Sequence, residues 1–383
     1  MGLVETGDAG VVHTLDPAYY TSDAIYQQEC FGLFMYTWQF AGHVSQAPNP
    51  GDYFTFEIAG QQLFCIRNYD NVLNTFYNVC QHRAHQLVQG QGQGKKTIVC
   101  PYHAWAYRLD GSLLRGPNIE VMPESVRDSV CLTSVSTQEF CGFIFVNLDD
   151  EAAQMESWFP EVETQLREFV PDIDLLKPME AISVNEKCNW KVSVENYSEC
   201  YHCRINHRTF ATGVIKAETY DIQPQGYCLR HTTECQNLDQ MSYPIDLDAN
   251  THAGDYSSWF LWPTFSFQVY PGNVLNTYHW QPTSVDEVMV SRGWYTVDGK
   301  PSDFIHDLAV QDRETTVEED IHLVESQQRG FKNRGYRPGP LVIDPSGGVN
   351  SEHSIQVLQQ LSLIHISEPT RRYAISYAVF CLK

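Results

Sequence analysis

The sequence has little positive charge. Its 383 residues include 25 Lys and Arg against 47 Asp and Glu, which gives a formal net charge of −22. A protein that binds nucleic acid needs clustered Lys and Arg to neutralise phosphates, and this sequence contains no such cluster. We therefore expect no nucleic-acid partner. The acidity suits a basic electron-transfer partner, although charge alone does not identify one.

Long apolar runs are also missing. A membrane-spanning helix needs about 20 consecutive apolar residues, and no run in this sequence approaches that length. The first residues, 1–5, show neither the basic region nor the apolar region of a secretory signal. We therefore predict a cytoplasmic protein that has no membrane partner.

The 12 cysteines lack the arrangement of a disulfide framework, which is typical of short secreted chains. Most of them lie singly in apolar segments, as Cys65, Cys131 and Cys141 do, and we expect these to be buried free thiols. Because 43% of the residues are hydrophobic, the chain can fill a sizeable core without disulfides.

The pattern of the sequence changes near residue 150. Short alternating or apolar segments, such as 54–58 and 141–146, predict strands. We therefore expect an all-β domain over residues 41–150. Residues 1–40 are predicted to form an N-terminal arm that packs on the domain following the all-β one.

Residues 151–360 mix helices with strands and are predicted to form a second domain, so that the fold class is α+β. One helix is expected around 194–205. A longer helical stretch is expected over about 302–330, interrupted near Thr315 because the residues after it read as a capping box. Residues 361–383 resemble translated vector sequence, and we set them aside as a non-native tail.

Two short segments each offer one cysteine and one histidine, in the spacing C-x-H-x17-C-x2-H. The four residues are Cys80, His82, Cys100 and His103. In a Rieske [2Fe–2S] centre two cysteines bind one iron and two histidines bind the other. A tetrahedral zinc site can also use two cysteines and two histidines, but zinc fingers group like ligands in pairs. The alternation of Cys and His therefore favours the iron–sulfur cluster.

A second cluster contains His202 and His207, which could meet at one metal if the helix ends or distorts between them. Two histidines and one carboxylate on one face of an iron ion leave positions open for oxygen and substrate. The acidic helix start at 318–320 is the region expected to supply the carboxylate. Two alternatives remain, namely a structural role for the histidines, and zinc or redox chemistry at the C-x2-C formed by Cys200 and Cys203. An electron-transfer centre that precedes an oxygen-activating centre favours iron.

At these motifs the sequence resembles the α subunits of Rieske ring-hydroxylating oxygenases, over about residues 30–360. Segments 323–330 and 351–353 resemble the branch that contains carnitine oxygenase, glycine betaine monooxygenase and choline monooxygenase. The resemblance implies an N-terminal all-β Rieske domain and a helix-grip-like catalytic domain with an antiparallel sheet.

The resemblance also implies roles for single residues. The cluster ligands would be Cys80, His82, Cys100 and His103. The ligands of a mononuclear Fe(II) ion would be His202, His207 and Asp320. Glu199 would be an acidic bridge that joins its own His202 to His103 of a neighbouring subunit in a homotrimer, and as i,i+3 residues Glu199 and His202 would share a helix face. The chain departs from the family at Arg208, where a proline usually follows the second histidine.

The activity implied is that of a terminal oxygenase, which takes electrons from a separate flavin and iron–sulfur reductase and uses O2 to hydroxylate a small cationic substrate of the carnitine, betaine or choline type. Aromatic rings recognise a quaternary ammonium by cation–π attraction. The candidate rings are Tyr201, Trp259, Phe260, Trp262, Phe265, Phe267, Tyr270 and Tyr278. Tyr201, Trp262, Phe265 and Phe267 are singled out as substrate contacts, although for any single ring a core role is the more common one. The alternative is an aromatic-ring hydroxylating dioxygenase, against which Glu199 argues, because most ring-hydroxylating members have Asp there.

Overall fold

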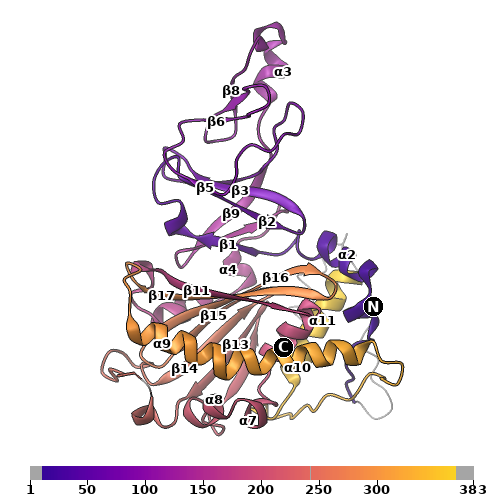
Figure 1. The fold of residues 1–383 in the computed structure, drawn as a ribbon, viewed down its shortest axis with the longest axis vertical. Helices are drawn as coiled ribbons and strands as arrows, with labels where there is room; N and C mark the ends of the chain where they lie inside the picture. Colours follow the sequence, from indigo (N-terminus) through magenta and orange to yellow (C-terminus); the bar gives the residue numbers. More distant parts are fainter. Residues whose placement is uncertain (1–10, 242, 368–383) are drawn as a thin grey trace. The chain divides into compact units, whose positions relative to one another are not determined.

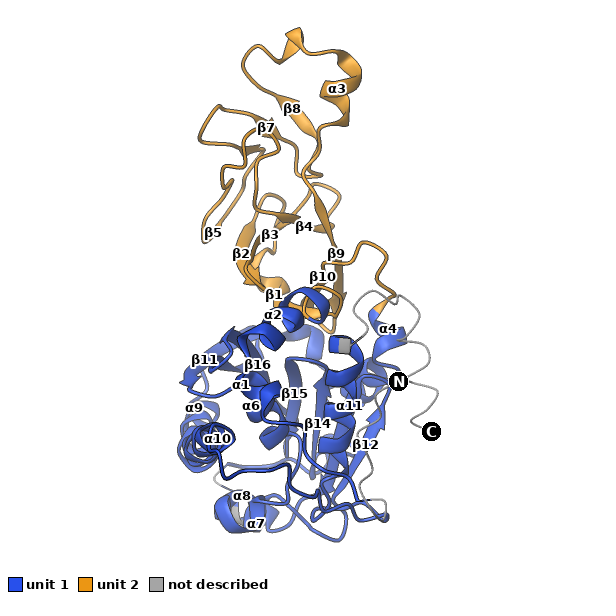
Figure 2. Ribbon diagram, turned by 90° about the vertical axis from the view of Figure 1, so that its right-hand side faces the viewer, with its two compact units in different colours: residues 1–33, 155–383 blue, residues 34–154 orange. Residues whose placement is uncertain are grey.

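The computed structural model describes residues 11–241 and 243–367. The chain divides into two compact units, coloured separately in Figure 2. Residues 34–154 form the first, which we call the β unit, and the described residues of 11–33 and 155–367 form the second, which we call the mixed unit. Of the predicted N-terminal arm, residues 11–33, which we call the N-terminal segment, belong to the mixed unit, and residues 34–40 belong to the β unit.

The β unit contains a seven-stranded antiparallel sheet in the order β1-β10-β9-β4-β3-β2-β5 and a three-stranded sheet in the order β6-β7-β8. Its strands are β1 (Gln39–His43), β2 (Tyr53–Ile58), β3 (Gln61–Arg67), β4 (Leu73–Tyr77), β5 (Gln91–Gly92), β6 (Ile98–Val99), β7 (Ala106–Tyr107), β8 (Leu113–Arg115), β9 (Ser134–Phe140) and β10 (Phe143–Asn147). Its one α-helix among the described residues is α3 (Glu124–Ser129). The strand-rich architecture predicted for this part of the chain is confirmed.

The mixed unit is built on a second seven-stranded antiparallel sheet, in the order β11-β17-β16-β15-β14-β13-β12. Its strands are β11 (Leu176–Glu186), β12 (Asp221–Gln225), β13 (Cys228–Glu234), β14 (Asp255–Leu261), β15 (Phe265–Tyr270), β16 (Val274–Ser284) and β17 (Glu287–Val297). Side chains alternate between the two faces of these strands, and this alternation decides which residues can reach the site described below.

Helices cover this sheet (Figure 1). They are α1 (Ala18–Thr21), α2 (Asp23–Gly32), α4 (Met155–Trp158), α5 (Val162–Phe169), α6 (Trp190–Tyr197), α7 (Cys203–Asn206), α8 (Arg208–Gly213), α9 (Asp303–Asp312), α10 (Glu318–Phe331) and α11 (His353–Ser367). Figure 1 shows α9 and α10 running one after the other along one face of the sheet. Helix α10 also packs on α6 and α1.

Two helix predictions need correction. The helix expected around 194–205 is two helices, α6 and α7, because residues 198–202 form turns. The predicted interruption near Thr315 is present, but its cause differs. A π-helical turn over Arg313–Val317 separates α9 from α10, and no side chain caps the start of α10, so the predicted capping box is absent. Such π turns occur often at functional sites.

The end of the described chain continues the fold. Helix α11 extends to Ser367, and both Leu361 and His365 are buried, so the segment that we set aside as a tail begins inside a packed helix. Residues 368–383 lie outside the described residues. Within the described ranges, no helix combines the length and apolar character that crossing a bilayer requires.

Candidate active site

In the β unit, the two predicted cluster loops have the same backbone path. The carbonyl of Cys80 accepts a hydrogen bond from the amide of Ala84, and the carbonyl of Cys100 accepts one from the amide of Ala104, both at 3.0 Å. Both alanines have left-handed φ angles, 58° and 56°. Each loop thus presents its cysteine and histidine on a similar tight turn, and a shared cluster requires one such pair from each of two loops.

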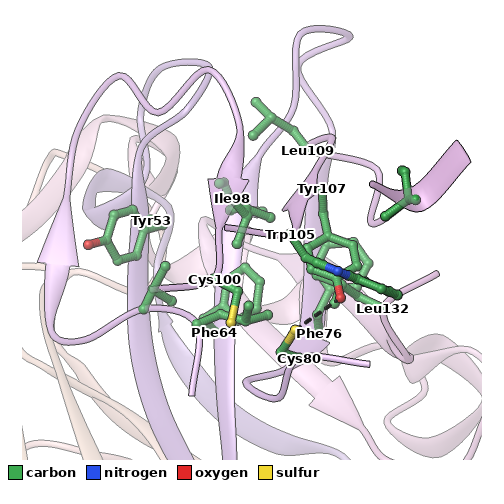
Figure 3. Packing of buried hydrophobic residues seen from close by; sticks show 14 residues of the cluster. Tyr53, Phe64, Phe76, Cys80, Ile98, Cys100, Trp105, Tyr107, Leu109 and Leu132 are labelled. Carbon is green, nitrogen blue, oxygen red and sulfur yellow. Dashed lines mark hydrogen bonds between the residues drawn. The ribbon is translucent and has the colours of Figure 1, made fainter. Parts of the chain in front are cut away.

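The cluster candidates differ in burial. Cys80 and Cys100 are each 2% exposed and lie in an apolar cluster that includes Phe64, Ile98 and Tyr107 (Figure 3). The hydroxyl of Tyr107 accepts a hydrogen bond from the amide of Gln81 at 3.1 Å and lies 3.2 Å from Sγ of Cys80. A hydroxyl that accepts one bond can donate its proton to the sulfur, which would stabilise a thiolate there.

The two histidines of these loops are more accessible. The centroids of the His82 and His103 rings lie 4.7 Å apart, and His82 stacks on Trp105 at 4.6 Å. Two buried cysteine sulfur atoms and two more accessible imidazoles are a donor set suited to a cluster with one sulfur-bound and one nitrogen-bound iron.

In the mixed unit, His202, His207 and Asp320 each offer one ligand atom within 4.8 Å of the others. Nε2 of His207 lies 3.0 Å from Nε2 of His202 and 2.9 Å from Oδ1 of Asp320, and the third side of the triangle is 3.6 Å. Ligand atoms about 2.1 Å from one ion and at right angles to each other lie about 3 Å apart. The triangle therefore fits three ligands on one face of a metal ion, with the remaining positions open.

Each of these histidines is held from behind by a carboxylate. Glu199 contacts Nδ1 of His202, and Glu319 lies 2.9 Å from Nδ1 of His207. A carboxylate that accepts the Nδ1 proton leaves Nε2 deprotonated, fixes the orientation of the ring and raises its basicity. Glu199 thus occupies the position beside His202 that the sequence predicted, although the contact arises in a turn and not on a helix face. Glu319 was not predicted, although it belongs to the acidic segment from which we expected the third ligand.

Local structure explains why the ligands meet. His202 and His207 flank the one-turn helix α7 on its two sides, and Asp320 lies in the first turn of α10, directly after the π-helical turn. Cys200 and Cys203, on either side of His202, are joined in a disulfide. They therefore offer no thiolates to a metal, which removes the zinc alternative for this C-x2-C segment.

A pocket opens at the ligand triangle, and its wall is strongly aromatic. The aromatic residues that line it are Tyr197, Phe210, Tyr220, Tyr256, Tyr270, Tyr278 and Trp280. None of the four rings singled out from the sequence lines it, although Tyr270 and Tyr278 of the wider candidate set do. Tyr201 is 45% exposed, and Trp262, Phe265 and Phe267 are buried elsewhere. Gln268 and Tyr270 of β15 face the pocket, so strand alternation directs Phe265 and Phe267 to the opposite face of the sheet.

Comparisons with known proteins identify a family for each of the two units. A model of the Rieske [2Fe–2S] domain matches residues 37–126, and a model of the ring hydroxylating alpha subunit (catalytic domain) matches residues 173–362. The two metal sites found above lie within these two ranges. The chain thus combines an iron–sulfur domain with a catalytic domain that binds mononuclear iron.

Full-length relatives support the same assignment. The carnitine monooxygenase oxygenase subunit of Escherichia coli (strain K12) is 33% identical over 89% of this chain and 91% of that protein. The choline monooxygenase, chloroplastic, of Spinacia oleracea is 28% identical over 89% of this chain and 77% of that protein. The crystal structure of the quaternary ammonium Rieske monooxygenase CntA in complex with L-carnitine superposes with a TM-score of 0.81 and 30% identity, over 94% of this chain and 97% of that one.

The resemblance noted in the sequence is therefore confirmed at the level of domains, fold and full-length relatives. The chain belongs to the Rieske ring-hydroxylating oxygenase α subunits and is a Rieske non-haem iron monooxygenase of that family.

Proposed function

We propose that the protein is the terminal oxygenase component of a monooxygenase system that hydroxylates a small quaternary ammonium compound with O2. The observation that carries this proposal is the aromatic pocket that opens at the His202, His207 and Asp320 triangle. A quaternary ammonium offers no hydrogen bond, and an aromatic ring attracts it with about 0.5–2 kcal/mol by cation–π interaction. The relatives named for carnitine and choline support the same substrate class.

The proposal assigns Cys80, His82, Cys100 and His103 to the [2Fe–2S] cluster, and His202, His207 and Asp320 to Fe(II). When bound, the cluster supplies single electrons and the iron supplies the activation of O2. The protein's own contribution is positional. Glu199 and Glu319 fix the two imidazole rings, and the pocket residues hold a substrate carbon beside the open face of the triangle.

We also propose that Glu199 links subunits in a homotrimer. Its carboxylate already contacts Nδ1 of its own His202, and its second contact would be His103 of a neighbouring chain. A solved quaternary ammonium Rieske monooxygenase is described as giving insight into inter-subunit electron transfer, which supports this assignment. The electrons would come from a separate flavin and iron–sulfur reductase. Of the eleven cysteines among the described residues, two form the Cys200–Cys203 disulfide, two are assigned to the cluster and seven are free thiols. The predominance of free thiols suits a reducing compartment, and we place the protein in the cytoplasm.

The test is a substrate panel with the holoenzyme and a Rieske-compatible reductase. Oxygen uptake would be followed with carnitine, glycine betaine, choline and an aromatic acid, together with the release of formaldehyde or a trialkylamine. We expect uptake coupled to product formation with at least one quaternary ammonium compound and none with the aromatic acid. Coupled uptake with the aromatic acid alone would replace the proposal by the aromatic-ring dioxygenase alternative.

Tyr278→Leu provides a matched test of the aromatic wall, because it removes one ring from the pocket while Tyr243→Leu removes a buried ring that does not line it. Loss of one cation–π contact of about 0.5–2 kcal/mol predicts an increase in the substrate Kd of about 2- to 30-fold for the first variant. The second variant should leave the Kd unchanged. Equal effects from both would argue against recognition by the pocket rings.

A further inference from the structure

The described lining of the pocket at the iron site contains acidic side chains and histidines. Its described lining includes three carboxylates, those of Glu186, Glu199 and Asp320, and no lysine or arginine. Two of these carboxylates have partners in the site, because Glu199 contacts His202 and Asp320 contacts His207. Glu186 is the one carboxylate of the described lining that contacts neither histidine of the ligand triangle.

Glu186 is the last residue of β11 and is 5% exposed. The thiol of Cys188 donates a weak bond to its Oε2 at 3.8 Å, and Ser193 also bonds to it. Within the described residues it forms no ion pair. Burial raises the pKa of Glu186 to about 7, and the negative charges of Asp320 and Glu325 add to this, although the bonds from Ser193 and Cys188 act in the opposite direction. A buried carboxylate without a cation is unfavourable. A cation that enters the pocket would therefore stabilise the ionised form of Glu186 and be attracted by it.

A buried cation that contacts a ring of the pocket wall is already paired with an acid. Arg292 of β17 is 3% exposed, forms an ion pair with Asp312, and donates to Gln268 at 3.1 Å. Its guanidinium lies 3.9 Å from the centroid of Tyr278, behind the pocket wall. Arg204, which follows the ligand His202 closely in the chain, is exposed and does not line the pocket.

A bound zwitterion would therefore bring a carboxylate into a buried pocket where no free basic side chain receives it. That carboxylate would also be repelled by Glu186 in its ionised form, which a pKa of about 7 leaves about half populated at neutral pH. A cation without a carboxylate is attracted by Glu186 and by the aromatic rings, and it brings no negative charge that Glu186 would repel.

We propose that Glu186 is a specificity-determining residue, which makes the pocket selective for quaternary ammonium cations that carry no carboxylate, such as amino alcohols of the choline type, over zwitterions such as carnitine and glycine betaine. The inference rests on the proposed function, because it concerns the substrate class of the same pocket.

The experiment compares ligands of similar size, of which one lacks the positive charge of choline and one carries an added carboxylate. Dissociation constants for choline, glycine betaine and the neutral choline isostere 3,3-dimethyl-1-butanol are measured on the anaerobic holoenzyme by calorimetry, with kcat/KM from oxygen uptake. We expect choline to bind at least tenfold more tightly than either of the other two. Equal or tighter binding of glycine betaine would overturn the inference.

The Glu186→Gln variant tests the residue itself. Removing the charge while keeping the shape should weaken choline binding and lower the choline-to-betaine preference at least tenfold, with unchanged iron content. Glu186→Asp keeps the charge and should retain most of the preference, and it serves if the first variant fails to fold. The matched control is Glu180→Gln on the same strand, whose carboxylate bonds to His306 at the surface and which should leave the preference unchanged.

The possible results separate the two proposals. A preference unaffected by Glu186→Gln would overturn the role of Glu186 while quaternary ammonium turnover remains intact. If no quaternary ammonium compound binds or stimulates oxygen uptake, the proposed function itself is wrong, and the inference that rests on it is overturned as well.

Discussion

A buried ion pair joins the N-terminal segment to the helix that leads into the iron site. Lys191, in α6, is 2% exposed and pairs with Glu29 of α2, which is 0% exposed and also accepts a hydrogen bond from the indole of Trp190 at 2.9 Å. We predict that Lys191→Met, which keeps the length of the side chain, strongly destabilises the mixed unit, because it leaves Glu29 buried without its cation.

The magnitude can be estimated from two limits. Removing one partner of a buried pair costs about 3–5 kcal/mol. The variant can instead protonate the remaining carboxyl, and for an ordinary glutamic acid this costs about 3.7 kcal/mol at pH 7 and about 1 kcal/mol at pH 5. The free energy of unfolding should therefore fall by about 3–3.7 kcal/mol at pH 7 and by only about 1 kcal/mol at pH 5.

Urea unfolding followed by tryptophan fluorescence measures this difference. Two further variants make the test specific. The double variant Glu29→Gln with Lys191→Met removes both charges and should recover most of the loss at pH 7. Lys177→Met breaks an exposed pair with Asp298 and should cost less than about 1 kcal/mol. A Lys191→Met protein with the same deficit at both pH values, or no recovery in the double variant, would refute the reasoning.

Three other predictions concern side chains in or beside the iron site. Asp320→Asn should lose one iron per chain and keep the Rieske EPR signal, whereas retention of all iron would argue against this ligand. Glu319→Gln should weaken iron binding about 10- to 100-fold, with activity restored by excess Fe(II), whereas Glu199→Gln, if Glu199 is the bridge, should stay inactive when fully loaded with iron. Burial, helped by nearby His353, lowers the pKa of His231 to about 3, so the stability from keeping it neutral is complete above about pH 6.5 and is lost as the pH falls toward 3. At pH 5 the loss is about 2 kcal/mol, and His231→Phe should show a shallower decline of the urea midpoint between pH 7 and pH 5.

The sequence was most informative where ligand chemistry restricts the spacing. Cys80, His82, Cys100 and His103 could be recognised because alternating Cys and His within two short segments suits few metal sites. The seven aromatic residues of the pocket wall could not be recognised as a set in this way, although Tyr270 and Tyr278 were among the candidate rings, because they come from separate segments and each looks like a core residue on its own. Which face of β15 turns toward the pocket depends on strand register, and a shift of one residue exchanges the two faces.

Helix propensity also predicted one helix at the iron site where the structure has two, and the spacing of the two histidine ligands explains the difference. Residues five apart on a continuous α-helix point about 140° away from each other, so His202 and His207 can share a metal only if the helix ends or distorts between them, as the sequence predicted. The chain meets the requirement by ending α6, turning, and placing both histidines at the ends of the one-turn helix α7. A second irregularity, the π-helical turn at Arg313–Val317, precedes the third ligand. Both departures from regular helix occur where the ligand triangle needs them, and such conflicts between local preference and observed structure are expected at functional sites.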